Sequence, residues 1–505
     1  MEGVYDDFDR CYRAVLSKDA RFDGWFVTAV LTTKIYCRPS CPVRPPYARN
    51  MRFYPTAAAA QKAGFHPCKR CRPDASPGSP EWNVRGDVVA RAMRLIADGT
   101  VDRDGVTGLA SRLGYTTRQL ERLLQAEVGA NPLALARAQR TQTARILIET
   151  TELPFSDVAF AAGFSSIRQF NDTVRSVCDM TPTALRQRAR ARFGGGDGGT
   201  GALSLRLAVR TPFAYEGLFG HLAASAVPGV EEVRDGAYRR TLRLPNGNGI
   251  VSLTPQPDHV QCRVTLDDFR DLATAIARCR RLLDLDADPE AVVDALSGDP
   301  ELSVLVAKAP GQRIPRTVDE QELALRVVLG QQVSVKAART HAARLVSAYG
   351  QPVTDTEGAL THVFPAIEQL ADIDPAHLAF PKARQRSLIA LIRGIAAREV
   401  VLDAGTDWND AREQLRAVSG IGDWTAEVIA MRGLGDPDAF PVSDLGVRLA
   451  AEQVGLPCNQ RALTERSKRW RPWRSYATQH LWTALEHAVN EWPPKEKSDG
   501  NPAVS

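Results

Sequence analysis

The sequence lacks long hydrophobic runs and carries little overall charge. No stretch of about 18 apolar residues occurs in the 505-residue chain, so we expect no membrane-spanning helix and no membrane partner. The first seven residues are acidic and lack an apolar core, which is not the pattern of a secretory leader. These absences predict a cytoplasmic protein.

The small net charge of +5 is unevenly distributed along the chain. Residues 1–192 contain 29 Lys and Arg against 19 Asp and Glu, a net charge of +10, whereas residues 193–505 carry −5. A basic half attached to a mildly acidic half indicates a nucleic-acid partner for the basic half. Charge alone does not identify that partner.

Cysteine is scarce outside one cluster. The chain has nine cysteines, an odd number that does not suit a disulfide framework, and four of them fall within 35 residues. The pairs Cys37-x3-Cys41 and Cys68-x2-Cys71 are separated by 26 residues. This spacing predicts one Zn²⁺ held tetrahedrally by two knuckles. On spacing alone, a purely structural zinc site and a chemically active one both remain open.

Glycine marks the main boundary in a chain that is long enough for several domains. Six glycines lie within residues 194–201, a composition typical of a flexible linker. Before the linker, two stretches with helical periodicity turn at Gly114 and at Gly163. After it, the alternation that begins at Leu203 predicts strands. A helical pattern follows, and residues 317–320 have the pattern of a capping box that opens it.

The residues around the cysteines resemble a known family. Residues 32–41 (TTKIYCRPSC) and 63–71 (AGFHPCKRC) are similar to the N-terminal domain of the Ada adaptive-response proteins, with a likeness from about Arg10 to Pro73. The resemblance implies that Cys37 is both a zinc ligand and a nucleophile that accepts a methyl group from a DNA methylphosphotriester. Zinc would keep the thiol deprotonated, and the thiolate is the nucleophile. Methylation would remove one negative charge from the site and so raise its affinity for DNA, once per molecule.

Basic and polar residues near this site are expected to face the DNA backbone. The basic residues of the motif are Arg38, Lys69, Arg70 and Arg72. The resemblance implies further DNA contacts at Thr33, Arg44 and His66. Pro42 and His66 stand where the family has arginine, which weakens the expected phosphate contacts. We do not expect His66 to bind metal, because four cysteines already complete the zinc site.

Two helix-turn-helix patterns lie in the basic half, over residues 106–124 and 157–170. Two such units at this separation resemble the AraC family of transcription activators over about residues 84–190. In the first unit, four residues would project from the second helix toward a major groove: Thr117, Arg118, Gln119 and Arg122. The resemblance implies promoter DNA as a partner and RNA polymerase as the target of activation. An ordinary helical bundle with a basic surface is the alternative.

The C-terminal half contains a helix–hairpin–helix pattern over residues 415–426. Gly420 and Gly422 would allow a tight hairpin whose backbone N–H groups bind a DNA phosphate. Asp444 follows about twenty residues later, where the helix–hairpin–helix glycosylases have their catalytic aspartate. The closer resemblance, from about Leu203 to Pro493, is to the AlkA or 3-methyladenine DNA glycosylase II family. A helix cap or a solvated carboxylate is the ordinary role of a lone aspartate.

This resemblance implies how the C-terminal half would act. Trp424 stands where strand-cleaving relatives have a Schiff-base lysine, so we predict a monofunctional glycosylase. Trp424 and Trp482 match the pocket aromatics that hold a flipped, positively charged base, although they could also be core tryptophans. Gln332 stands where the family has a leucine wedge, and Val428 replaces an aromatic of the pocket. Asp444 would stabilise an oxocarbenium-like sugar and assist the attacking water.

The sequence therefore predicts a multidomain, mainly α protein with a small zinc domain, an α+β subdomain like the TATA-binding protein, and a helix–hairpin–helix glycosylase core. The predicted segments are a zinc methyl-acceptor, a double helix-turn-helix, a linker, a strand-rich subdomain, a glycosylase domain and a disordered tail, over residues 1–77, 84–192, 193–202, 203–310, 311–493 and 494–505. Methyl transfer, transcription activation and base excision on double-stranded DNA are the expected activities. No Pro-Cys-His-Arg string occurs, so no O6-methylguanine transfer is expected. The alternative is a transcription regulator whose C-terminal half only binds DNA.

Overall fold

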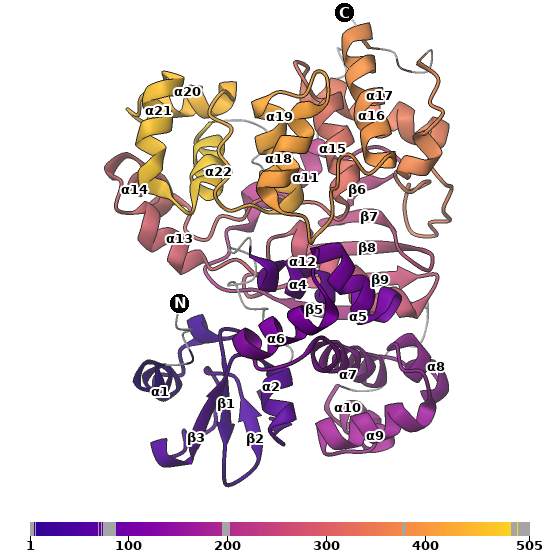
Figure 1. Ribbon diagram of the computed structural model, residues 1–505, viewed down its shortest axis with the longest axis vertical. Helices are drawn as coiled ribbons and strands as arrows, with labels where there is room; N and C mark the ends of the chain where they lie inside the picture. The colour runs from indigo at the N-terminus through magenta and orange to yellow at the C-terminus, as the bar shows by residue number, and fades with distance from the viewer. Residues whose placement is uncertain are drawn as a thin grey trace, which may run out of the picture.

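The computed structural model describes residues 5, 7–68, 70–71, 73, 87–193, 202–375, 378, 380–485 and 492. Nearly all of the predicted linker 193–202 and the whole of the tail 494–505 lie outside these residues, as do Lys69 and Arg72. Figure 1 shows the N-terminal sheet and the helices α7 to α10 at one end, a second sheet in the middle, and the C-terminal helices at the other end. Within the described part of the chain, no helix is long and apolar enough to span a bilayer.

The N-terminal unit is a small sheet flanked by helices. Its strands run in the order β3-β1-β2-β4, with β2 and β4 parallel and the other pairs antiparallel. Asp7 and Thr56 cap the two α-helices by accepting backbone N–H groups, which stabilises their first turns. The elements are α1 (Phe8–Leu16), η2 (Ala20–Phe22), β1 (Val27–Val30), β2 (Ile35–Cys37), η3 (Ala48–Asn50), β3 (Met51–Tyr54), α2 (Ala57–Lys62) and β4 (His66–Pro67).

The next unit is all helical, as the sequence predicts. The two helix pairs are α5 with α6 and α8 with α9, and they turn at Gly114 (φ 76°) and near Gly163 (φ 83°). Glycine adopts this left-handed conformation without the penalty of a Cβ atom. Thr116 and Gln119 form a capping box at the start of α6. The helices are α4 (Val88–Ala97), α5 (Thr100–Leu113), α6 (Thr117–Val128), α7 (Pro132–Thr150), α8 (Phe155–Ala161), α9 (Ile167–Cys178) and α10 (Pro182–Phe193).

The middle of the molecule is a five-stranded antiparallel sheet in the order β5-β9-β8-β7-β6. Buried and more exposed residues alternate along β5, β8 and β9, so each strand presents one face to a core. The elements are β5 (Leu203–Ala208), α11 (Tyr215–Ser225), β6 (Glu231–Arg234), β7 (Ala237–Arg243), β8 (Asn248–Pro255), β9 (His259–Leu266), η5 (Phe269–Asp271) and α12 (Leu272–Leu282).

The C-terminal part is a helical domain with two hydrophobic cores, one formed mainly around α15 to α19 and the other around α20 to α22. Asp319, not Thr317, caps α15: it accepts the backbone N–H groups of residues 321 and 322, while the Thr317 hydroxyl bonds the Asp319 backbone. The predicted capping box is therefore wrong by two residues. The elements are α13 (Pro289–Leu296), α14 (Pro300–Lys308), α15 (Glu320–Leu329), α16 (Val335–Tyr349), η6 (Ile367–Leu370), α17 (Lys382–Ala396), α18 (Trp408–Ala417), α19 (Asp423–Val428), the π-helical η8 (Ile429–Leu434), α20 (Leu445–Gln453), α21 (Gln460–Ser467), η9 (Lys468–Trp470) and α22 (Arg474–Ala484).

The helix-turn-helix unit packs directly on the C-terminal helical domain through α4. Arg91 Nε donates to the carbonyl oxygen of Gly405 at 2.6 Å, and Arg94 Nε donates to that of Ala404 at 2.8 Å. The Arg94 guanidinium lies 5.3 Å from the centre of the Trp408 ring. Burial, and next the charges of neighbouring arginines, lower the pKa of Arg94 to about 9. The two halves of the chain therefore share a desolvated interface, which the sequence did not predict.

Gly405 provides a test of this interface. A Cβ atom at Gly405 would lie 2.5 Å from Cδ1 of the buried Leu95 on α4, whereas at Gly298 it would meet only a carbonyl oxygen at 3.6 Å. We predict that Gly405→Ala lowers the free energy of unfolding by about 1–3 kcal/mol, because overpacking forces the two surfaces apart. Gly298→Ala is the matched control and should not destabilise. Urea unfolding followed by tryptophan fluorescence measures both, and equal midpoints for the two variants would contradict the interface.

Candidate metal centre and candidate active site

The four predicted zinc ligands come together in the N-terminal unit. The sulfur atoms of Cys37, Cys41, Cys68 and Cys71 all lie within 4.8 Å of one another. Four thiolates around Zn²⁺ at about 2.3 Å would lie about 3.8 Å apart in a tetrahedron, so the cluster has the size that zinc requires. Three of the cysteines are buried, whereas Cys37 is partly exposed.

Strand pairing determines this arrangement. The parallel strands β2 and β4 align Tyr36 with Pro67, so the next residues of both strands, Cys37 and Cys68, lie side by side. The backbone N–H of Cys68 donates to the carbonyl oxygen of Tyr36 at 2.8 Å. Each knuckle thus leaves the sheet from a fixed point, and the second cysteine of each pair follows within a short turn.

The electrostatics of the cluster fit a cation. Hydrogen bonds with Cys68 and Cys71, and next burial, raise the pKa of the Cys37 thiol above its usual range. A proton shared between close sulfur atoms is hard to remove while the group is partly desolvated. Four ionised thiols this close together would repel one another, and a bound zinc ion would neutralise that repulsion.

Asp23 supports the first knuckle, a role that no local sequence signal indicated. Its buried carboxylate accepts the Ser40 backbone N–H at 3.0 Å and the Ser40 hydroxyl at 2.6 Å. Arg38 Nη1 lies 3.3 Å from the same carboxylate, so part of the charge expected to face DNA is directed inward. The Asp23 carbonyl oxygen also accepts a hydrogen bond from Arg210 at 2.7 Å, which links the knuckle to the central sheet domain.

The predicted DNA contacts of the N-terminal unit differ in exposure. Thr33, Arg44 and Pro42 are exposed on its surface. His66 is only partly exposed, and its Nδ1 lies 3.4 Å from the carbonyl oxygen of Val177 on α9. His66 therefore contacts the helix-turn-helix unit on one side, and it is not among the clustered metal-ligating side chains.

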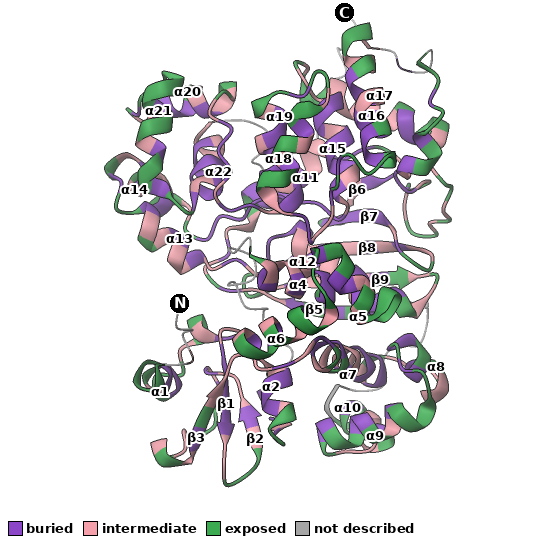
Figure 2. Ribbon diagram, in the orientation of Figure 1, coloured by how far each residue is buried: buried purple, intermediate pink, exposed green. Residues whose placement is uncertain are grey.

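The helix-turn-helix unit exposes three of the four residues expected to face a groove, and the fourth, Thr117, is partly exposed. Arg118, Gln119 and Arg122 are exposed on α6, while Leu120, Leu124 and Val128 on its other face are fully buried. The Gln119 side chain also bonds Thr116 in the capping box, so it serves the helix start. The outer surface of α9 is largely exposed as well (Figure 2). Both second helices thus keep a free polar face.

The predicted hairpin joins α18 to α19. Gly420 has φ 84°, and a Cβ atom there would lie 1.8 Å from Ser387 Oγ, so this position requires glycine for two independent reasons. Gly422 is exposed and has open space around its missing Cβ. The buried Ile421 anchors the turn between them. A hairpin with an accessible backbone at its tip is what phosphate binding needs.

Asp444 is the meeting point of three N–H donors. Trp424 Nε1 donates to Oδ2 at 2.8 Å, while Trp482 Nε1 and the backbone N–H of Val447 donate to Oδ1, each at 2.9 Å. Asp444 is thus also the N-cap of α20. The two predicted pocket tryptophans come from α19 and α22, which lie far apart in the sequence. Both are partly exposed, and each packs against one of the two hydrophobic cores.

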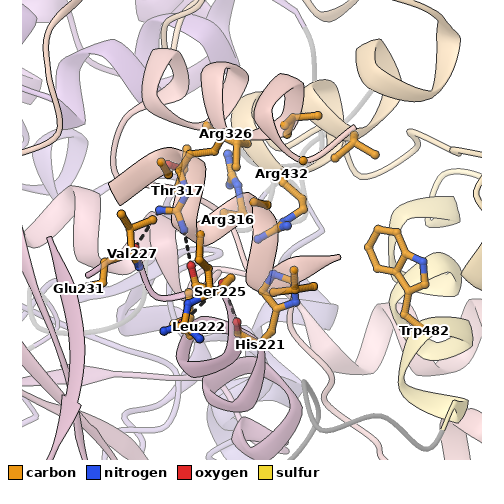
Figure 3. A pocket seen from close by; sticks show the side chains of 18 of the residues that line it. His221, Leu222, Ser225, Val227, Glu231, Arg316, Thr317, Arg326, Arg432 and Trp482 are labelled. Atoms are coloured by element: carbon orange, nitrogen blue, oxygen red, sulfur yellow. Dashed lines mark hydrogen bonds and ion pairs between the residues drawn. The ribbon is translucent and has the colours of Figure 1, made fainter. Parts of the chain in front are cut away.

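These three side chains line a pocket of about 460 Å³ between the central sheet domain and the C-terminal helices. The pocket is large enough for a nucleobase, and ligand pockets of this size are common. The buried Val428 lines it too. Figure 3 shows Trp482 on one side of the pocket, with His221 and Arg432 across from it. His221 and Arg432 were not predicted as site residues.

Gln332 lies outside this pocket lining, in the loop between α15 and α16. It is exposed and adopts a left-handed backbone conformation, with φ 54°. Non-glycine residues adopt this conformation rarely, and it often marks a functional position. The neighbouring Gln331 donates to Thr425 Oγ1 at 2.9 Å and so ties this loop to the hairpin helix.

Comparison with known families finds matches over four parts of the chain. The matches are the metal binding domain of Ada over residues 10–74, a helix-turn-helix domain over 109–188, the AlkA N-terminal domain over 204–319, and the HhH-GPD superfamily base excision DNA repair protein over 325–475. The cysteine cluster lies within the first match and Asp444 within the last. The four cysteines are accordingly a zinc site, and the fold is that of an Ada-like half fused to an AlkA-like half.

Individual relatives match either the whole chain or a part of it. A Mycobacterium tuberculosis protein named "Probable bifunctional transcriptional activator/DNA repair enzyme AlkA" is 76% identical over 98% of this chain and 100% of its own length. DNA-3-methyladenine glycosylase 2 of Escherichia coli is 32% identical over 56% of this chain and 97% of its own length. The bifunctional transcriptional activator/DNA repair enzyme Ada of the same organism is 37% identical over 35% of this chain and 49% of its own length.

The zinc site yields a direct prediction. Purified protein should contain one zinc ion per chain, and Cys68→Ser should weaken zinc affinity by at least about tenfold, because a hydroxyl replaces a thiolate ligand. Cys458→Ser is the control, since Cys458 is exposed and lies outside the cluster. Elemental analysis after dialysis against a weak chelator measures the retained zinc. Full retention by Cys68→Ser would contradict the assignment.

Proposed function

The chain belongs to the family of the bifunctional transcriptional activator/DNA repair enzyme AlkA, and from this we propose three linked activities on double-stranded DNA. The C-terminal half excises alkylated bases of the 3-methyladenine type by hydrolysis. Cys37 accepts a methyl group from a DNA methylphosphotriester in a single turnover. The methylated protein then activates promoters, with RNA polymerase as the target of activation.

The geometry at Asp444 carries the glycosylase proposal. A carboxylate has about four lone-pair sites, and three of the four at Asp444 already accept N–H donors. These bonds fix the carboxylate in one orientation at the edge of the pocket and leave one site on Oδ2 for a water molecule. A fixed negative charge stabilises the positive charge that develops on the sugar as the bond to the base breaks. Water then adds at the sugar carbon and loses a proton toward Oδ2.

The two tryptophans hold the Asp444 carboxylate, and they are also suited to bind an alkylated base. N-alkylated purines carry a positive charge, which is attracted to the face of an indole ring. Trp424 also occupies the position after the hairpin and has no amine, so the sugar cannot be captured as a Schiff base. The reaction is therefore hydrolytic and leaves the DNA strand uncut. The backbone at Gly422 and the side chain of Gln332 would hold the DNA while the base is flipped out.

Replacing Asp444 with asparagine tests the glycosylase directly. The asparagine side chain can still cap α20 but lacks the negative charge, so Asp444→Asn should lower the rate of 3-methyladenine release by at least about 100-fold while keeping the fold. Asp407→Asn is a matched control, because Asp407 is the N-cap of α18 and lies outside the pocket lining. Chromatography of bases released from methylated duplex DNA measures both. Equal release by Asp444→Asn and wild type would favour a regulator whose C-terminal half only binds DNA.

The exposure of Cys37 supports it as the methyl acceptor. It is the one cysteine of the cluster that is not buried. Bound zinc supplies the positive charge that keeps the thiols ionised. The Cys37 thiolate forms a bond to the methyl carbon, the carbon–oxygen bond of the phosphotriester breaks, and the electron pair stays on the phosphate oxygen as an ordinary diester. Thr33 and Arg44 are exposed on the same unit and would be suited to hold that phosphate.

Mass spectrometry distinguishes this reaction from a structural zinc site. After incubation with DNA that contains methylphosphotriesters, we expect one methyl group per zinc-loaded chain, located on the peptide that contains Cys37. Cys458→Ser should gain the same single methyl group, whereas Cys37→Ser should gain none. An unmodified wild-type protein that retains its zinc would mean that the cluster is only structural.

A further inference from the structure

The pocket lining combines basic and polar side chains with the two tryptophans. Besides Asp444 and the two tryptophans, the lining includes His221 from α11, Arg432 from η8 and Gln479 from α22. Figure 3 shows His221 and Arg432 between the Arg316–Arg326 group and Trp482. A flipped base that reaches this part of the lining would therefore meet hydrogen-bonding groups at its edge.

Several of these groups have unused hydrogen-bonding capacity. Nε2 of His221 and Oε1 of Gln479 are buried and have no partner within the described residues. Arg432 donates through Nε to the carbonyl oxygen of Pro315 at 2.7 Å, but its other two nitrogen atoms have no hydrogen bond and no ion pair within the described part of the chain. A buried polar group without a partner costs free energy. This cost is offset when a ligand supplies the missing partners.

The neighbouring arginines, in contrast, have carboxylate partners for their side-chain donors. Arg326 and Arg240 bond Glu231 and Glu322 in a buried network. Arg432 is partly buried and has no carboxylate partner within the described residues, and burial, with the charge of Arg326 next, lowers its pKa to about 10. Burial, and next the charges of Arg432 and Arg326, hold the pKa of His221 well below its usual range, so its ring is neutral with one donor and one acceptor.

We infer that His221, Arg432 and Gln479 form a subsite that reads the edge of the flipped base and favours guanine-type over adenine-type alkylated bases. Arginine donors complement the carbonyl oxygen at position 6 of guanine, and the acceptor oxygen of Gln479 complements the N–H groups beside it. An adenine-type base presents an amino group where guanine has the carbonyl, so its N–H would face the Arg432 donors. The inference rests on the proposed function of the C-terminal half.

A comparison of 3-methylguanine with 3-methyladenine isolates this effect. Both carry the same methyl group and the same positive charge before release, so the tryptophan faces and Asp444 treat them alike. They differ at the edge that the subsite would contact. The selectivity is the ratio of kcat/KM for release of 3-methylguanine to that for 3-methyladenine, measured by chromatography of bases released from one batch of methylated DNA.

We expect Arg432→Met and His221→Phe each to lower this ratio by about five- to tenfold, because each removes hydrogen bonds made to the guanine edge. His221→Phe keeps a ring of similar shape, so it remains informative if Arg432→Met does not fold. Arg461→Met is the control: Arg461 is exposed on α21 and lies outside the pocket lining, so its ratio should equal that of wild type.

The outcomes distinguish a failure of the proposed subsite from a failure of the proposed glycosylase function. A lower ratio in both variants, with the control unchanged, supports the subsite. Release of both bases with an unchanged ratio overturns the subsite but leaves the glycosylase intact. An equal loss of both bases assigns His221 and Arg432 a purely structural role and also overturns it. A wild-type protein that releases neither base overturns the proposed function, and the subsite with it.

Discussion

The candidate active site depends on one interaction: the carboxylate of Asp444 accepting three N–H groups from three helices. Trp424 brings in α19 and the hairpin, Trp482 brings in α22, and Val447 lies in the first turn of α20. Because the three donors belong to elements that pack in different cores, the carboxylate can hold this position only when both cores are folded. The geometry of the candidate site therefore depends on domain packing, and the pocket is lined by residues that pack in or against both cores.

In the N-terminal half, contacts between separate elements likewise fix the positions of the cysteine sulfur atoms. Parallel pairing of β2 with β4 brings Cys37 beside Cys68, and Asp23 fixes the first knuckle through Ser40. Arg210 then ties Asp23 to the central sheet domain, while Arg91 and Arg94 tie α4 to the loop before α18. The cysteine cluster and the pocket at Asp444 thus belong to halves that share desolvated contacts, so a structural change in one half has a physical route to the other.

Local sequence signals predicted the parts of these sites that depend on local geometry. Cysteine spacing predicted the cluster, because each knuckle closes within a few residues, and the two glycines predicted the hairpin that leads to Asp444. The sequence could not predict His221 or Arg432, because they reach the pocket from elements about 200 residues apart and neither has a local motif. The interface at Arg94 was missed for the same reason. The cap of α15 was misplaced because Thr317 and Asp319 are both good capping residues, and only tertiary packing selects Asp319.

In the proposed reaction, Asp444 stabilises a positive charge on the sugar. The most direct measurement is the affinity for duplex DNA in which a pyrrolidine ring, which is cationic, replaces the damaged sugar. A neutral tetrahydrofuran ring in the same duplex is the reference. We expect Asp444→Asn to bind the cationic duplex about 100-fold more weakly than wild type does, because a positioned negative charge acts on the cation. Its affinity for the neutral duplex should change little. Equal losses for both duplexes, or none, would contradict it.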